Sequence, residues 1–181
     1  MTNPYLQEAT AAQFSYESRE ALVSRYAWAI PNDESLDALV AVRKPFVEIG
    51  AGNGYWASLL DQHGVSVQCY DRNPGRHTPK SSGKLWHPIA EGGPGNITDA
   101  HRYYALLLIW PPYDDPMATD ALLQYMKAGG TTVAYVGESN YGCTGDDEYH
   151  RILDAHWHLD ECISLPVWQG IHDNLYLYGR R

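Results

Sequence analysis

A turn rich in glycine is the stretch of this sequence with the clearest capacity to bind a ligand. Gly50, Gly52 and Gly54 occupy alternate positions between an apolar run at 46–49 and an amphipathic helical pattern. Glycine reaches positive φ without strain, and a β-carbon here would clash or would keep a ligand away from the main chain. The first N–H groups of the following helix add hydrogen-bond donors and the positive end of a dipole. The turn therefore predicts a ligand site at the end of a strand.

A carboxylate follows the next predicted strand. The run at 65–70 alternates and is rich in β-forming residues, and Asp71 comes directly after it. Asp71 lies about 20 residues after Gly50, the spacing at which an acidic residue binds ribose in doubly wound folds. Its two acceptor oxygens suit the two sugar hydroxyls. A turn residue ahead of Asn73-Pro74-Gly75 is the alternative.

The spacing of the glycines separates two kinds of nucleotide site. The dinucleotide fingerprint is G-x-G-x-x-G, but Tyr55 stands at its third glycine position, which disfavours a pyrophosphate ligand. Glu48 and the three glycines form E-x-G-x-G-x-G, which resembles motif I of class I S-adenosylmethionine (SAM)-dependent methyltransferases. The resemblance implies that SAM is the cofactor and that the glycine loop approaches the amino-acid part of SAM. It also implies that Glu48 helps to fix the loop and to bind SAM. A plain structural turn in an unrelated α/β protein is the alternative.

A second motif follows the apolar run at 104–109. Trp110-Pro111-Pro112-Tyr113 is similar to motif IV of the amino-methyltransferases, usually Asp/Asn/Ser-Pro-Pro-aromatic. In that family the first residue accepts hydrogen bonds from an NH₂ group and the aromatic residue stacks on a planar substrate. Here Trp110 replaces the polar acceptor, and its ring is expected to lie against the cofactor or its sulfonium by cation–π attraction. A Pro-Pro turn that caps a helix is the alternative.

The predicted site combines these motifs with nearby acids. Methyl transfer requires the removal of one proton, and Asp114, or Glu138 after the fifth predicted strand, is expected to take it while Tyr113 places the substrate. The predicted cofactor-binding residues are Tyr26, Glu48, Gly50, Ala51, Gly52, Asn53, Gly54, Asp71, Arg72 and Trp110. No metal is expected, since the nearest candidate set at 156–162 lacks a fourth ligand and a known spacing.

The elements that must position these residues alternate between strand and helix patterns. Apolar or alternating runs predict strands, and spacings of three and four predict helices. The strands are expected at 46–49, 65–70, 84–89, 104–109, 131–136, 157–167 and 174–178, and the helices at 17–30 and after residues 33, 55, 116 and 146, with 1–15 loosely ordered. The order predicts an α/β fold: a doubly wound, mostly parallel seven-stranded sheet with helices on both faces and an antiparallel terminal strand.

The length of 181 residues fits a single SAM-dependent methyltransferase domain, 1–181. Residues 1–32 would form an N-terminal extension or lid, and residues 33–181 the Rossmann-like core. The segment 25–31, which contains Tyr26, is the lid candidate; ordinary packing of an N-terminal helix on the sheet is the alternative.

Composition narrows the function further. The net charge of −9 disfavours a protein that mainly coats nucleic acid, and no run of about 18 apolar residues predicts a membrane span. Three widely spaced cysteines favour a cytoplasmic setting. We therefore expect methyl transfer to nitrogen of a small molecule or protein. A nucleic-acid amino-methyltransferase and a non-catalytic SAM-binding subunit remain as alternatives, and the sequence leaves the oligomeric state open.

Overall fold

The computed structural model describes residues 3–139 and 142–181. Residues 1, 2, 140 and 141, which belong to the predicted N-terminal segment and to a polar loop predicted at 137–145, lie outside the described residues. The helices are α1 (Pro4–Ala11), α2 (Tyr16–Arg25), α3 (Asp33–Ala41), α4 (Tyr55–Gln62), α5 (Met117–Ala128) and α6 (Asp147–His156), with short 3₁₀ turns at Pro94–Asn96 and Asp99–Tyr103. The strands are β1 (Phe46–Ile49), β2 (Val67–Asp71), β3 (Ile89–Glu91), β4 (Ala105–Ile109), β5 (Thr132–Gly137), β6 (Trp157–Ser164) and β7 (Asn174–Arg180).

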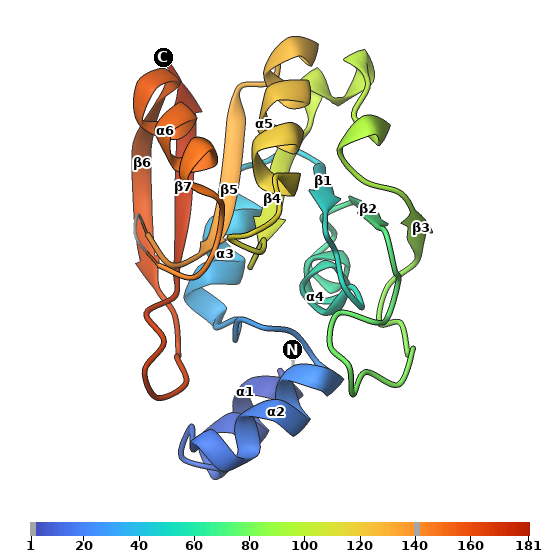
Figure 1. Ribbon diagram of the computed structural model, residues 1–181, viewed down its shortest axis with the longest axis vertical. Coiled ribbons are helices and arrows are strands. Elements are labelled where there is room, and N and C mark those ends of the chain that lie inside the picture. The colour runs from blue at the N-terminus through green and yellow to red at the C-terminus, as the bar shows by residue number, and fades with distance from the viewer. Residues whose placement is uncertain (1–2, 140–141) are drawn as a thin grey trace.

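The described strands form one sheet in the order β3-β2-β1-β4-β5-β7-β6 (Figure 1). β1 to β5 pair in parallel, and β7 runs antiparallel to both β5 and β6. The predicted fold class is therefore confirmed. The apolar run at β4 occupies a central position, between β1 and β5, as its burial on both faces predicts.

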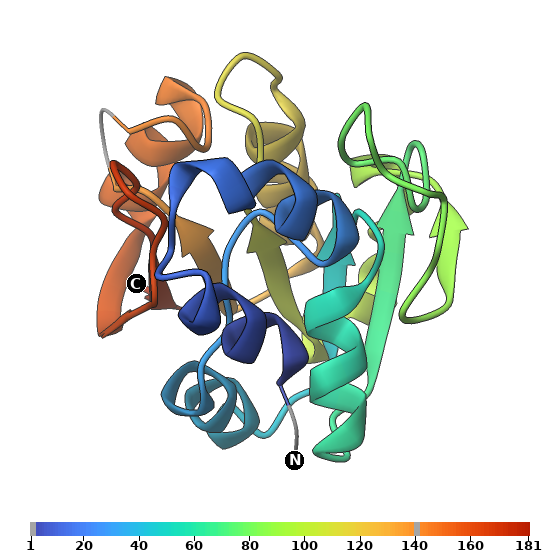
Figure 2. The same ribbon diagram turned by 90° about the horizontal axis from the view of Figure 1, so that it is seen from below.

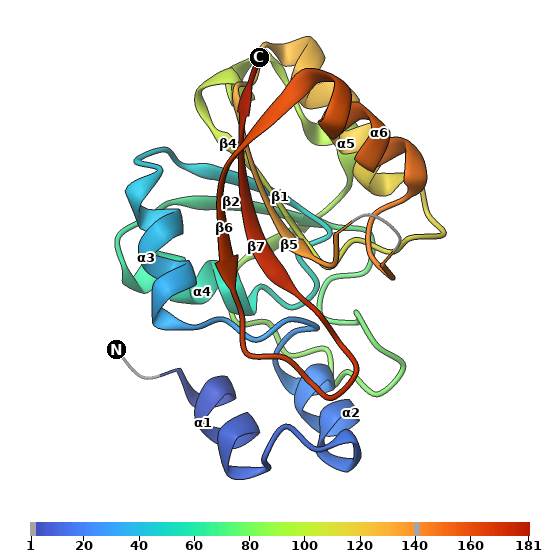
Figure 3. The ribbon, with the colours of Figure 1, turned by 90° about the vertical axis from the view of Figure 1, so that its left-hand side faces the viewer.

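Helices cover both faces of the sheet, with α3 and α4 on one side and α5 and α6 on the other (Figure 3). Because successive strand side chains point to opposite faces, β4 contributes to two separate cores. Ala105 and Leu107 pack with the α3 and α4 side, whereas Leu106 and Leu108 pack with α5 and α6.

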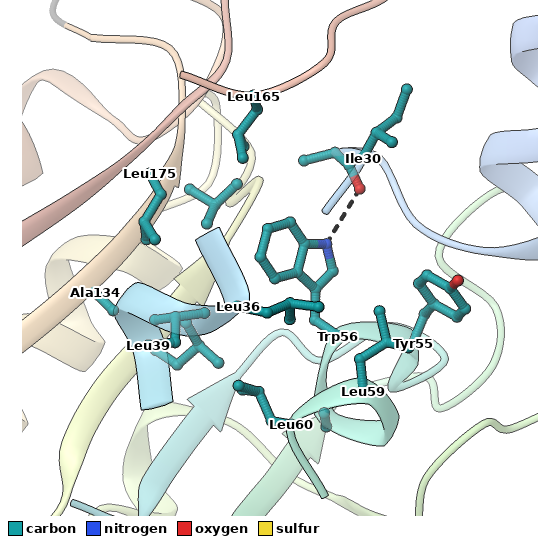
Figure 4. Packing of buried hydrophobic residues seen from close by; sticks show 14 of the residues in the cluster. Ile30, Leu36, Leu39, Tyr55, Trp56, Leu59, Leu60, Ala134, Leu165 and Leu175 are labelled. Carbon is teal, nitrogen blue, oxygen red and sulfur yellow. Dashed lines mark hydrogen bonds between the residues drawn. The ribbon is translucent and has the colours of Figure 1, made fainter. Parts of the chain in front are cut away.

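The helix α4 is anchored through Trp56. Its indole lies in the buried cluster that contains Leu36, Leu39 and Leu60 (Figure 4), and the indole N–H donates to the main-chain oxygen of Ala29 at 3.1 Å. A single buried side chain thus joins α4, α3 and the segment that follows α2.

The N-terminal region is more ordered than its sequence predicts. Residues 4–11 form α1, whose start is capped by Asn3: the side-chain oxygen accepts from the N–H of Leu6 at 3.1 Å. Tyr5 and Ala9 are fully buried. The expectation of a loosely ordered segment was wrong because the partners of these side chains, such as Trp168, lie far along the chain.

Two other elements depart most from their predicted bounds. The first predicted helix ends at Arg25 and not near Ile30, since Tyr26 leaves the helical conformation and the Arg25 carbonyl accepts from the side chains of Asn53 and Trp86. The third strand is confined to 89–91, because the preceding residues turn towards the glycine loop, where the Trp86 N–H donates to the Asn53 carbonyl.

The N-terminal helices lie beyond the carboxyl ends of the parallel strands (Figures 2 and 3). This edge of the sheet is also where the glycine loop and the Pro-Pro turn are found. In the described part of the chain, no helix is long and apolar enough to cross a membrane.

Candidate functional site

A cavity of about 700 Å³ opens at the carboxyl ends of β1, β2 and β4. Its volume falls within the range of roughly 300–1,000 Å³ that is typical of small-molecule sites. The predicted residues that line it are Glu48, Gly50, Ala51, Gly52, Asn53, Asp71, Arg72, Trp110, Tyr113 and Asp114. The two sequence motifs therefore face one shared space, as the strand order requires.

The glycine loop has the backbone conformation that its sequence predicts. Gly50, Gly52 and Gly54 have φ values of 77°, 62° and 76°, which side chains rarely tolerate. A β-carbon on Gly52 would lie 3.2 Å from the Cβ of His77, and one on Gly54 would lie 2.9 Å from the Cβ of His87. At these two positions glycine is required by close approach of the protein's own loop 72–88.

Asp71 holds the glycine loop against β2. One carboxylate oxygen accepts from the Gly52 N–H at 2.8 Å, and the other accepts from the Asn73 N–H at 2.7 Å. Because each carboxylate oxygen has more than one acceptor site, this arrangement leaves Asp71 with capacity for a ligand. The Asp71 side chain lines the cavity.

Glu48 is a buried carboxyl group that also lines the cavity. Only 2% of its surface is exposed, and the hydrogen bond that its side chain makes is with the Cys69 thiol, 3.5 Å from Oε2. Burial raises the pKa of Glu48 to about 8, with the Cys69 contact lowering it and the Asp71 charge raising it. A neutral carboxyl group at pH 7 therefore faces the ligand space from β1.

The turn after β4 has an unusual conformation at Trp110. This residue adopts φ 53°, and its N–H donates to the Val136 carbonyl at 2.7 Å. Its indole N–H lies 2.9 Å from both carboxylate oxygens of Asp173. Burial raises the pKa of Asp173 to about 7, whereas the Trp110 hydrogen bond lowers it. The first position of the motif thus carries a side chain whose polar atom is already used.

Trp110 also stacks on Trp28 from the N-terminal segment. The ring centroids are 4.7 Å apart and the planes differ by 8°. Trp28 and its neighbour Ala27 both line the cavity, so part of the predicted lid segment reaches the site. Tyr26 is not among the lining residues: it is buried, stacks on Tyr5 and donates its hydroxyl to Glu8.

The three residues predicted as catalytic lie in different environments. Tyr113 is 62% exposed at the cavity rim, and Asp114 lies beside it. Glu138 is not among the lining residues, and its carboxylate accepts from the N–H groups of Cys143 and His172 at 2.9 Å each. Burial raises the pKa of Glu138, but these hydrogen bonds outweigh it and hold the pKa below its usual value. Such a carboxylate is a weak base.

Arg72 and Gly54 each make a structural contribution that the sequence did not predict. Arg72 lines the cavity, but its guanidinium forms an ion pair with Asp115 at 2.8 Å across the opening between the β2 and β4 turns. Gly54 is not among the lining residues. Its left-handed conformation instead starts α4.

Several lining residues were not predicted from the sequence. Met117 approaches Gly50 so closely that a β-carbon there would lie 2.9 Å from its sulfur. His77 reaches the cavity from the loop after β2 and hydrogen-bonds the Val23 carbonyl of α2. Neither the contact of Met117 with Gly50 nor that of His77 with Val23 could be predicted from residue spacing, because the partners are far apart in the sequence. Among the described residues, no cluster of three or more potential metal ligands is found.

No protein-family model matches this chain, and no curated protein sequence matches it. Solved structures do resemble it in fold. One is magnesium protoporphyrin IX methyltransferase (ChlM) from Synechocystis PCC 6803 with bound SAM, with TM-score 0.54 and 11% identity, covering 82% of this chain and 77% of that one.

Two further structures have the same fold. The 1,6-didemethyltoxoflavin-N1-methyltransferase from Burkholderia thailandensis, with bound 1,6-didemethyltoxoflavin and S-adenosylhomocysteine, has TM-score 0.56 and 13% identity, over 98% of this chain and 88% of that one. A putative type 11 methyltransferase from Sulfolobus solfataricus has TM-score 0.55 and 14% identity, over 82% and 91%. The chain therefore has the Rossmann-like fold that these methyltransferases share.

Proposed function

We propose that this chain is a SAM-dependent methyltransferase that transfers the methyl group to nitrogen of a small molecule or a protein. The observation that carries the proposal is the shared cavity. The glycine loop and Asp71 line one part of it and the Pro-Pro turn lines another, so one ligand space contacts both motifs. The bound SAM in the ChlM structure and the bound S-adenosylhomocysteine in the toxoflavin enzyme support the same assignment.

The residues of the cavity fit the chemical groups of SAM. Asp71 would accept from the sugar hydroxyls with the lone pairs that its two main-chain hydrogen bonds leave free. Glu48 would face the ammonium group of the amino-acid part of SAM. The positive charge of that group would favour the ionised form of this buried carboxyl. The main chain of Ala51 and Asn53 would line the part between them.

The part of the cavity beyond the glycine loop would hold the methyl acceptor. SAM would supply an electrophilic methyl group there, and the protein would orient the acceptor and remove one proton. Asp114 is the base that we assign, because it lines the cavity and is exposed to solvent. Tyr113 at the rim would contact the acceptor. Glu138 receives no role in proton transfer, since it does not line the cavity and its hydrogen bonds hold its pKa below the usual value.

Nucleic acid is the less favoured acceptor. Five acids line the cavity against two arginines, Arg72 and Arg76, and the whole chain has a charge of −9. Both features oppose a phosphate backbone.

The three unpaired cysteines agree with a reducing, cytoplasmic setting.

One observation favours a second candidate, a SAM-binding subunit without transferase activity. Trp110 stands where motif IV has a hydrogen-bond acceptor, and its indole offers only an N–H donor, which Asp173 accepts. A protein of this kind would bind SAM in the same cavity and transfer no methyl group.

Calorimetry with SAM and S-adenosylhomocysteine separates these possibilities from a chain that binds neither. The variant Asp71→Ala should lose binding, whereas Asp61→Ala, at an exposed site on α4, should keep it. Label transfer from methyl-labelled SAM to pools of small amines and peptides then tests catalysis. Binding that survives in Asp71→Ala, or absent in the unaltered protein, contradicts the proposal; binding with no transfer to any pool favours the second candidate.

A further inference from the structure

The two stacked indoles form a wall at the acceptor end of the cavity. Trp28 comes from the segment after α2 and Trp110 from the turn after β4, and both line the cavity while remaining partly exposed. Each ring covers one face of the other, at a centroid distance of 4.7 Å and an interplanar angle of 8°. The chain thus places two flat apolar surfaces where the polar acceptor of motif IV would stand.

The position of this wall depends on Asp173, which precedes β7. The residue is buried, with 4% of its surface exposed, and both carboxylate oxygens lie 2.9 Å from the Trp110 indole nitrogen. The Arg19 guanidinium lies 5.7 Å and 5.9 Å from the centroids of the two stacked rings. These nearly equal distances place it beside the edge of the stack, because a cation over one face would be much closer to that ring.

The hydrogen bond to Asp173 also determines what the wall presents to a ligand. An indole has one polar group, its N–H donor, and here that donor is used inside the protein. What remains for the cavity is an aromatic carbon surface. Ile109, Pro111 and Met117 also line the cavity and add further apolar area.

We propose that Asp173 is a positioning residue that holds Trp110 against Trp28, and that the resulting wall selects an acceptor whose nitrogen belongs to a flat aromatic ring system. The proposal rests on the proposed function and gives its substrate class. A flat ring buries more area against an indole face than a puckered ring of equal size and adds the attraction of aromatic stacking. A basic aliphatic amine gains neither advantage at a wall that has no acceptor side chain.

A spectroscopic test addresses the positioning role without any ligand. Two stacked indoles in contact couple their electronic transitions, which gives hypochromism in absorption and, through the in-plane twist of one ring against the other, an exciton-coupled circular dichroism signal. The signal should be present in the unaltered protein and absent from Trp28→Phe and Trp110→Phe. It should be lost in Asp173→Ala and retained in Asp173→Asn, whose amide oxygen still accepts from the indole N–H. Trp86→Phe is the matched control. The Trp86 indole N–H also donates to the N-terminal region, at the Arg25 carbonyl, but Trp86 does not line the cavity.

A binding test addresses the substrate class. Quinoline, which is flat, and 2-decalone, a neutral saturated bicycle of similar size, are titrated into the protein saturated with S-adenosylhomocysteine, and binding is followed by saturation-transfer NMR. Quinoline should bind more tightly than 2-decalone. Asp173→Ala should weaken quinoline binding by up to about fivefold, because the hydrogen bond that fixes Trp110 contributes roughly 1 kcal/mol to the position of the wall. The affinity for S-adenosylhomocysteine should not change.

Three results would overturn the inference: an exciton signal unchanged in Asp173→Ala, equal or tighter binding of 2-decalone, or no binding of quinoline to the saturated protein. If Asp173→Ala does not fold, Asp173→Leu fills the same space without a hydrogen-bond acceptor and leaves both indoles in place, and its exciton signal and quinoline affinity decide the question. Failure of the unaltered protein to bind S-adenosylhomocysteine would refute the proposed function instead, and the circular dichroism measurements would still test the role of Asp173.

Discussion

Replacing Glu48 with glutamine should stabilise the protein at alkaline pH. Burial raises the pKa of this carboxyl from 4.5 to about 8 in the folded chain. A group whose pKa is raised on folding contributes its full stability below the unfolded pKa and loses it as the pH rises through the folded pKa. The loss for Glu48 therefore occurs between about pH 4.5 and pH 8. Glutamine has the shape of the neutral carboxyl and does not ionise.

The size of the effect follows from the same difference. One pH unit corresponds to about 1.4 kcal/mol, so 3.5 units give roughly 5 kcal/mol as an upper limit above pH 8. Near pH 7, where most of the carboxyl is still protonated in the folded state, the expected cost is about 3 kcal/mol. These values are large beside the total stability of a domain, which is about 5–15 kcal/mol.

Urea unfolding at pH 4.5, 7 and 8.5 provides the measurement. Glu48→Gln and the unaltered protein should have similar free energies of unfolding at pH 4.5, and the variant should become the more stable of the two as the pH rises. Glu91→Gln, at an exposed glutamate of β3, is the matched control and should give no such divergence. Parallel stability curves for Glu48→Gln and the unaltered protein would show that Glu48 titrates as an ordinary carboxyl, and would refute the argument from burial.

Four other outcomes follow from individual contacts. In the proposed site, pairing of the SAM ammonium with Glu48 should release about one proton per SAM bound at pH 7; calorimetry in buffers of different ionisation enthalpy should detect it in the unaltered protein and not in Glu48→Gln. Gly52→Ala should destabilise the fold by about 1–3 kcal/mol, because the residue has φ 62° and its β-carbon would press on His77; urea unfolding measures this. Asn3→Ala removes three hydrogen bonds around the start of α1 and should cost about 2 kcal/mol in the same assay, with local loss of amide-exchange protection in α1. Arg72→Ala breaks an exposed ion pair and should change stability by less than about 1 kcal/mol, so a larger effect would show that the pair does more than bridge the cavity mouth.

The sequence predicted the sheet well because its signals are local. The apolar run of β4, the alternation of β2 and the glycine turn each report on neighbouring residues alone, and with the rules of α/β folds they predicted the mostly parallel seven-stranded sheet. The start of the chain was mispredicted for the opposite reason. Few apolar residues mark α1, and its Tyr5 is buried by Tyr55 and Trp168, which are distant in sequence.

The site shows the same division. Its backbone features, such as the positive φ of Gly50, could be inferred from residue type, and so could the carboxylate at the end of β2. The hydrogen-bond partners of the side chains could not be inferred in this way. Glu138 was expected to face the ligand but accepts from the main-chain N–H of His172, 34 residues away, and Asp173 contacts Trp110, 63 residues away. Residue spacing carries no information on such contacts, because the fold alone brings the partners together.

The substitution at the start of the Pro-Pro motif gains a physical explanation from these contacts. A left-handed conformation such as φ 53° at Trp110 costs a residue with a side chain about 1–2 kcal/mol, so other interactions must compensate for it. Here the main-chain N–H bonds to β5, the indole N–H bonds to the Asp173 carboxylate, and the ring stacks on Trp28. A small polar residue would satisfy the first of these contacts and lose the other two. Tryptophan at this position therefore stabilises the turn and ties it to the N-terminal segment, and any acceptor must be recognised by the surface that this arrangement leaves exposed.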